Sequence, residues 1–175
     1  MRSDLLRNMV RKRGKNQLAR SVFFSFHYKN DISRVMVVRN RWVTHGGQIV
    51  SGVIDHAAFM EVQSKGDAAI KRWINQQMEG TTATVVLIGS ETLKRYYVQY
   101  EILHSLERGN AIIGVYINHI KDWSGRTSLA CNPHTEITCI GKNKPIYFDE
   151  IADGIYDYQI DDGYHNLGRW VEDAL

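Results

Sequence analysis

The 175-residue sequence predicts an α/β domain in which helices cover both faces of a parallel sheet. Two observations support this fold class. Runs of apolar, β-branched and aromatic residues recur at 22–26, 83–88 and 111–117, and they lack the polar alternation of a half-exposed strand. Segments with apolar residues at helical spacing lie between these runs. Apolar strands separated by amphipathic helices are typical of a sheet that is buried on both faces.

The first third of the chain predicts a strand, a helix and a weaker strand. The strand at 22–26 leads into a helix that Asn30 or Asp31 can cap, because their side-chain oxygens accept hydrogen bonds from the first helical turn. The glycine pair at 46–47 ends this helix. Residues 49–54 predict a short second strand.

The middle of the chain repeats the pattern more strongly. The sequence S-K-G-D at 64–67 has the spacing of a capping box, so we expect a helix to begin there. A strand at 83–88 follows, and then a helix from about 92 to 108. Gly109 is a suitable left-handed stop for that helix. The next strand is predicted at 111–117.

The last third is less regular. Residues 118–144 are rich in Gly, Asn, Lys and Thr and predict a long loop, which in a compact domain is usually functional or mobile. Residues 145–148 predict a last short strand, and the D-D-G sequence at 161–163 leads into a terminal helix.

This order of elements, joined by right-handed crossovers, predicts a flavodoxin-like doubly wound sheet. Ligands of such sheets bind outside the carboxyl ends of the strands. In this chain the segments that follow the strands are 25–29, 55–59, 89–92 and the residues from 118 onward.

The charge is unevenly distributed. The chain has a net charge of +3, but residues 1–20 hold seven basic residues and one acidic residue, so the rest has 15 basic and 18 acidic residues. We therefore expect a basic extension over 1–19, either solvated or docked on a partner chain, and a single domain over 20–175. Because the body is slightly acidic, nucleic-acid binding is not expected.

Other composition features exclude several classes. No stretch approaches the roughly 18 apolar residues of a membrane helix. Two cysteines are too few for a disulfide framework, which predicts a reducing, cytoplasmic setting. No glycine-rich phosphate loop is present. Cys131, His134 and Cys139 with His119 match no common zinc site, so we expect neither a metal nor a cofactor.

Glu101 is the leading candidate for a functional carboxylate. On a helix, Tyr97, Glu101, His104 and Arg108 share one face, and a neighbouring apolar stripe faces inward. Glu101 is therefore expected at the border between core and surface. It is either a solvated helix residue or a group at the rim of a cleft.

The loop after the first strand offers further candidates. Phe26, His27 and Tyr28 could stack on a base or a nicotinamide ring, and Lys29 could meet a phosphate. The alternative is that Phe26 belongs to the core and His27 to a turn. Two polar candidates lie nearby in sequence: Asn40 on the first helix, for which a solvated position is the alternative, and Asp55 after the second strand.

Several segments, in order, resemble one known family. They include F-F-S-F-H-Y at 23–28, V-R-N-R-W-V at 38–43 and Y-V-Q-Y-E-I at 97–102. Further matching segments are 34–35, 66–74, 84–92, 108–110, 118–122 and 132–133. Together they resemble the TIR-like proteins of the bacterial Thoeris anti-phage system, the ThsB family, over about residues 20–135.

The resemblance implies a TIR fold and a reaction on NAD. Enzymatic TIR domains cleave the bond between nicotinamide and ribose, with a glutamate in an aromatic-Cys-x-x-Glu pattern. That glutamate maps onto Glu101 and the aromatic residue onto Tyr97, while Val98 takes the place of the cysteine. In Thoeris the product is a cyclised ADP-ribose signal that activates a partner effector, so NAD is a substrate here and not a cofactor. A homo-oligomer is also expected. The alternative is a non-catalytic TIR-like scaffold that acts by self-association or partner binding.

Overall fold

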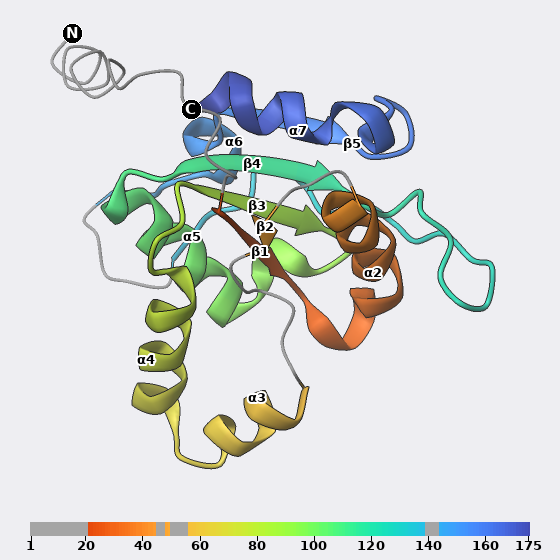
Figure 1. Cartoon of the computed structure of the whole chain (residues 1–175). Coiled ribbons are helices and arrows are strands. Elements are labelled where there is room, and N and C mark those ends of the chain that lie inside the picture. The colour runs from red at the N-terminus through yellow and green to blue at the C-terminus, as the bar shows by residue number, and fades with distance from the viewer. Residues whose placement is uncertain (1–20, 45–47, 50–55, 139–143) are drawn as a thin grey trace, which may run out of the picture.

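The computed structural model describes residues 21–44, 48–49, 56–138 and 144–175 (Figure 1). Its centre is a five-stranded parallel sheet with the strand order β2-β1-β3-β4-β5. This is the order of a flavodoxin-like doubly wound sheet, so the predicted fold class is confirmed. The strands are β1 (Ser21–Phe26), β2 (Gln48–Ile49), β3 (Ala83–Ile88), β4 (Ala111–Tyr116) and β5 (Gly154–Asp157).

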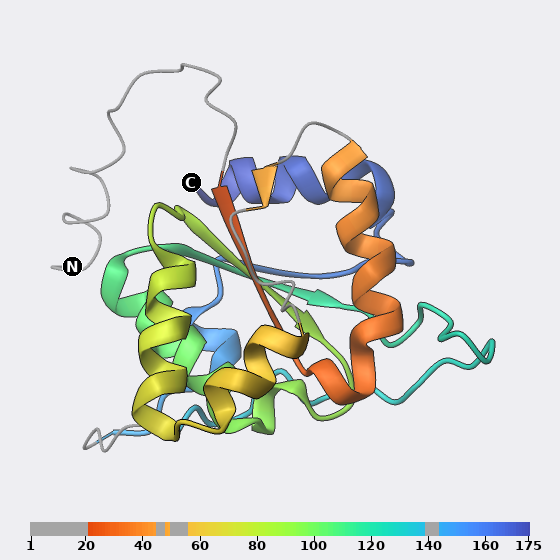
Figure 2. The same ribbon diagram turned by 60° about the horizontal axis from the view of Figure 1, so that its bottom comes forward.

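Helices cover both faces of the sheet. The helices α2 and α7 lie on one face, and α4 and α5 lie on the other (Figures 1 and 2). The helical elements are α2 (Tyr28–Thr44), α3 (His56–Gln63), α4 (Asp67–Met78), the 3-10 turn η1 (Thr92–Lys94), α5 (Tyr96–Arg108), α6 (Phe148–Ile151) and α7 (Gly163–Ala174).

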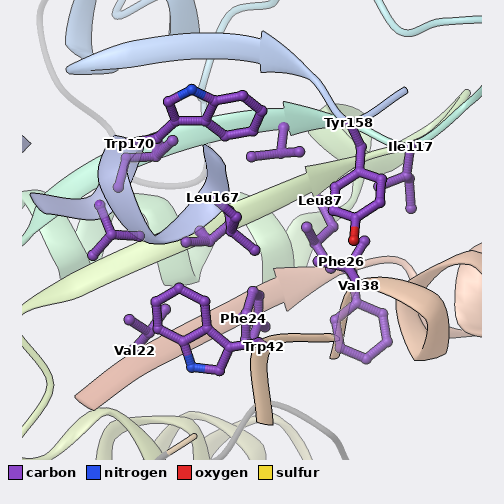
Figure 3. Close-up of a cluster of buried hydrophobic side chains, with 14 of the residues drawn as sticks. Val22, Phe24, Phe26, Val38, Trp42, Leu87, Ile117, Tyr158, Leu167 and Trp170 are labelled. Atoms are coloured by element: carbon purple, nitrogen blue, oxygen red, sulfur yellow. The ribbon is translucent and has the colours of Figure 1, made fainter. Parts of the chain in front are cut away.

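The larger core lies between the sheet and the pair α2 and α7 (Figure 3). Phe24 and Phe26 of β1 face this side. The Phe24 ring meets Trp42 of α2 edge-on, with ring centroids 6.0 Å apart. On α7, Trp170 stacks on Tyr156 of β5 at 4.2 Å. Burial of these large apolar surfaces is the main force that holds both helices on the sheet.

The opposite face has two smaller clusters. Ile88 of β3 and Ile102 of α5 belong to one, together with Phe148 of α6. Phe23 of β1 packs against Ile74 and its neighbours on α4 in the other. Alternate residues of β1 therefore belong to different faces, as the pleat requires. Ser25 has the same parity as Phe23 and faces the side of α4 and α5.

The strongest sequence signals are confirmed almost residue for residue. β1, β3 and β4 match the predicted strands to within a residue. Gly109 ends α5 with a φ of 73°, in the left-handed region that favours glycine.

Two expectations about local structure are wrong. The segment 145–148 is not a strand of the sheet, because it makes one isolated bridge, Glu136 with Tyr147, and enters α6. The fifth strand is β5, which was not predicted because it is only four residues long and begins and ends with Gly and Asp, which are depleted in strands. Pairing with β4 decides its conformation. The capping box also fails: the Ser64 hydroxyl donates to the Glu61 carbonyl at 2.6 Å, and Gly66 begins α4 without a side-chain cap.

The remaining predicted segments fall partly outside the described residues. The basic extension 1–19 and most of the second strand, 50–54, lie there, as does the helix stop at 46–47. Residues 117–138 contain no helix or strand apart from the isolated bridge at Glu136, and part of this segment extends away from the sheet beyond α2 (Figures 1 and 2). None of the described helices is long and apolar enough to cross a membrane.

Candidate active site

Glu101 lies in the second turn of α5, and its side chain turns toward the sheet. It is 8% exposed, and its Oε2 atom accepts a hydrogen bond of 2.5 Å from the Ser25 hydroxyl. Ser25 is one residue from the carboxyl end of β1 and is 1% exposed. The carboxyl group is therefore held beneath the edge of the sheet at which ligands of this fold bind.

This position corrects the prediction that Glu101 lies at the border of the core. The reason is the small polar surface of the sheet below α5. Ser25 on β1 and Thr84 on β3 both face the helix, and their short side chains leave room for a glutamate and offer hydroxyl groups to it or its neighbours. A large apolar residue at either position would have closed this space.

The helical turn that carries Glu101 is also tied to the sheet. The Ser105 hydroxyl donates to the Glu101 carbonyl at 2.7 Å and lies 2.7 Å from the Thr84 hydroxyl. Because the Ser105 hydroxyl donates its single proton to the Glu101 carbonyl, the Thr84 hydroxyl must be the donor in the bond between Thr84 and Ser105. The pair holds α5 in a fixed position over β3.

The environment of Glu101 disfavours ionisation. Burial raises the pKa of the Glu101 carboxyl to about 8, and the hydrogen bond from Ser25 opposes that shift. With this pKa, about one carboxyl in ten is ionised at pH 7. This raised pKa, caused by burial, makes Glu101 a candidate functional residue.

The loop after β1 places His27 beside the same edge of the sheet. His27 is half-buried, and its Nδ1 atom is buried with no hydrogen-bond partner among the described residues. Burial is the largest cause of its lowered pKa, and the Arg95 charge adds to it, so the ring is neutral at pH 7. Lys29 is exposed, and Tyr28 is half-buried.

Phe26 belongs to the core. It is 7% exposed and packs in the cluster with Val38 and Tyr158, on the sheet face opposite to Glu101 (Figure 3). Its ring centroid is 6.4 Å from that of Tyr28. Phe26 thus packs against Tyr28 from the core side. The alternative that Phe26 is a core residue is the one that the structure shows.

The other predicted residues are spread more widely. Tyr97 is half-buried in the first turn of α5, and its hydroxyl donates to Asp67 of α4 at 3.2 Å. Asn40 is exposed and lies twelve residues into α2, about 18 Å along the helix from the β1 loop. The structure therefore separates Asn40 from Glu101 and His27. Asp55 lies outside the described residues.

A buried pair of charged residues at the same edge was not identified as functional from the sequence. Arg34 of α2 is 4% exposed, its Nε atom donates to the Ile120 carbonyl at 2.8 Å and its Nη2 atom donates to the Arg126 carbonyl at 2.9 Å. Its Nη1 atom is 3.6 Å from the buried Asp31 carboxylate. Arg34 thus joins the loop after β4 to the start of α2. No spacing rule could reveal these partners, because they lie 86 and 92 residues away.

Asp31 connects this pair to the loop after β3. Its carboxylate lies against Gly89, where a Cβ atom would overlap it, and 3.4 Å from the Thr92 hydroxyl, which accepts a bond from the Gly89 N–H at 2.8 Å. Burial raises the pKa of Asp31, and the Arg34 charge opposes that rise. Gly89 is needed here for space and not for an unusual backbone angle.

We expect the substitution Gly89→Ala to lower the free energy of unfolding by about 1–3 kcal/mol, because the added methyl group displaces a buried carboxylate. Urea unfolding measures the effect. The matched control is Gly168→Ala in α7, where a Cβ atom meets nothing within 4 Å, and it should be stabilising by about 0.5–1 kcal/mol. Equal stability of the Gly89 variant and the wild-type protein would contradict the close contact.

Among the described residues, no group of three or more His, Cys, Asp or Glu side chains could hold a metal ion. His134 instead pairs with Asp149 at 3.0 Å and stacks on Tyr147, and His119 pairs with Asp157 at 2.6 Å. Cys131 is buried.

Comparison with known proteins shows the family to which this chain belongs. The model of the family described as "Thoeris protein ThsB, TIR-like domain" matches residues 23–122. This range includes most of β1, all of β3 and β4, and Glu101. A protein of Bacillus cereus (strain MSX-D12) named "Putative cyclic ADP-D-ribose synthase ThsB1" is 36% identical over 191 residues, covering 88% of this chain and 100% of that protein. The chain belongs to the Thoeris ThsB family of TIR-like domains.

Proposed function

We propose that this protein cleaves the bond between nicotinamide and ribose in NAD and cyclises the ADP-ribose into a signal. The signal would be a diffusible nucleotide that activates a partner effector in anti-phage defence. The name of the Bacillus relative, a cyclic ADP-D-ribose synthase, supports this class of reaction. The observation that carries the proposal is the buried Glu101 carboxyl, held by Ser25 beneath the ligand-binding edge.

The chemistry needs a negative charge near the ribose. When the bond to nicotinamide breaks, its electron pair leaves with the nicotinamide nitrogen and the sugar becomes oxocarbenium-like. An ionised Glu101 stabilises that positive charge. In cyclisation, a second nucleophile on the same ligand attacks the anomeric carbon and loses a proton; attack by water gives open ADP-ribose instead. Exclusion of water from the site favours the cyclic product.

The edge of the sheet supplies further contacts in this proposal. Tyr28 offers an aromatic face, Lys29 a charge for the phosphates, and His27 a neutral ring with an unpartnered nitrogen among the described residues. Tyr97 lies one helical turn before Glu101. Phe26 takes part only as the support of Tyr28, and Asn40 is too far along α2 to join them.

The test is incubation of the full chain with NAD, with nicotinamide measured by chromatography and the second product by mass. A product lighter than ADP-ribose by one water molecule is expected, because a nucleophile of the ligand itself, and not water, attacks the anomeric carbon. Open ADP-ribose alone would support cleavage without cyclisation. Absence of both products, with the protein folded and oligomeric, would overturn the proposal.

We predict that nicotinamide release rises with pH through about 8. The reaction needs the ionised carboxylate, and the pKa of Glu101 is raised to about 8, so the active form increases from pH 6 to pH 9. The rate at pH 6 should be about a hundredth of the rate at high pH. Because NAD itself degrades in base, each pH needs a protein-free blank. A rate that is constant or falls over this range would contradict the role of the ionised form.

A second candidate function is a non-catalytic scaffold. One observation favours it: Glu101 is 8% exposed, so a ligand has little direct access to the carboxyl in this structure. A scaffold would act in the cytoplasm through self-association, and the enzyme is also proposed to work there as a homo-oligomer. Light scattering shows assembly in either case, whereas nicotinamide release is expected of the enzyme alone.

A further inference from the structure

We propose that Ser25 is the positioning residue for Glu101, fixing the place of its carboxyl group and supplying the hydrogen bond that its ionised form requires. The catalytic consequence rests on the proposed function, but the effect on the carboxyl group does not. Ser25 lies on β1 and Glu101 on α5, so their hydrogen bond joins a strand and a helix across 76 positions of sequence.

The geometry makes Ser25 the natural partner of the carboxyl. The Oγ–Oε2 distance is 2.5 Å, and both side chains are buried. The hydroxyl has one proton to donate, and its proton goes to the carboxyl. When the carboxyl is ionised, this bond becomes charge-assisted and about twice as strong as a neutral one. Ser25 therefore selects one orientation of the Glu101 side chain.

Around the Glu101 carboxyl there are few other groups that could donate a hydrogen bond to it or pair with it. The strands β1 and β3 below α5 contain no ionisable residue. On β4, the Tyr116 hydroxyl donates to the Cys131 carbonyl at 2.8 Å. Lys94 of η1 is exposed, and on α4 Lys71 pairs with Asp67 at 2.9 Å.

On α5 itself the charged neighbours of Glu101 either pair with one another or are exposed. His104 faces Glu107 at 3.9 Å, and Arg108 is exposed in the last turn. Burial and the Ser25 bond are accordingly the causes that set the pKa of Glu101, and they act in opposite directions. Removing the hydroxyl leaves burial unopposed.

The experiment compares Ser25→Ala with the wild-type full chain by a carbon-13 titration of the Glu101 carboxyl, assigned with Glu101→Gln. The midpoint should move upward by about 1 pH unit, because the ionised form loses its donor. In parallel, the pH profile of kcat/KM for NAD should move in the same direction by the same amount. Near pH 7, kcat/KM should fall about tenfold.

The matched control is Thr84→Val. Thr84 is buried on the neighbouring strand and faces the same helix, and its hydroxyl bonds to Ser105 and not to the carboxyl. Valine keeps the shape of threonine. The titration midpoint of Glu101 should therefore stay within about 0.3 pH units, whereas a purely structural effect of a lost buried hydroxyl would be the same at both positions.

The outcomes separate the two proposals. An unchanged midpoint in Ser25→Ala, or an equal shift in Thr84→Val, overturns the positioning role. A shifted midpoint in a protein that releases no nicotinamide at any pH supports the role of Ser25 and contradicts the proposed function. If Ser25→Ala does not fold, Ser25→Cys keeps a similar volume with a weak donor and should shift the midpoint upward by less.

Discussion

Replacement of Glu101 by glutamine is expected to lower NAD turnover by about two to three orders of magnitude, the usual effect of removing one preorganised electrostatic group. Glutamine has the shape of the carboxyl and can accept the hydrogen bond from Ser25, which lies 2.5 Å away in the native protein. It has no negative charge to stabilise the ribosyl cation. Nicotinamide release at pH 8, measured against the wild-type protein, determines the effect.

The same variant should be more stable than the wild-type protein at pH 8. The folded pKa of about 8 exceeds the ordinary value of 4.5, so the folded state binds more protons between these values and its stability falls as pH rises through them. Glutamine does not titrate. The stability difference should be small below pH 4.5 and reach roughly 2–5 kcal/mol in favour of the variant near pH 8.

The control is Glu107→Gln on the exposed side of the same helix. It should leave both turnover and the pH dependence of stability close to those of the wild-type protein. Retained turnover in the Glu101 variant would remove its catalytic role. Loss of turnover together with loss of stability would instead indicate a structural glutamate.

Replacement of Arg34 by alanine should destabilise the protein by about 3–5 kcal/mol, the range for breaking a buried charged pair from one side. The variant loses the bonds to the Ile120 and Arg126 carbonyls and removes the Arg34 charge that lies 3.6 Å from the buried Asp31 carboxylate. The free energy of unfolding from urea titration measures the change. Because these contacts hold the loop after β4 beside the start of α2, near the proposed active site, turnover should also fall.

Two further variants test the cause. Lys65→Ala removes an exposed pair with Glu61 at 2.9 Å and should cost less than about 1 kcal/mol. Asp31→Asn combined with Arg34→Ala should recover part of the lost stability, since the buried charge that needed Arg34 is gone. A double variant no more stable than Arg34→Ala would show that the lost carbonyl contacts, and not the charge of Asp31, account for the effect.

The sheet could be predicted where the sequence pattern is local. The apolar runs of β1, β3 and β4 are long enough to identify a strand without any knowledge of their neighbours. The edge strand β5 and the short helix α6 could not be predicted, because pairing with β4 and packing of Phe148 decide their conformation. The same limit applies to the supposed capping box, in which Ser64 bonds backward to Glu61.

The candidate site, like the fold, was predictable only in the part that depends on local sequence. The pattern of residues 97–101 on an amphipathic helix, with the family resemblance, was enough to select Glu101 and to place it near the ends of the strands. Only the folded structure decided that its carboxyl is buried, that Ser25 is its partner and that Arg34 and Asp31 brace the neighbouring loops. Periodicity reports which face of one element is apolar, whereas burial and hydrogen bonding depend on which side chains of other elements meet that face.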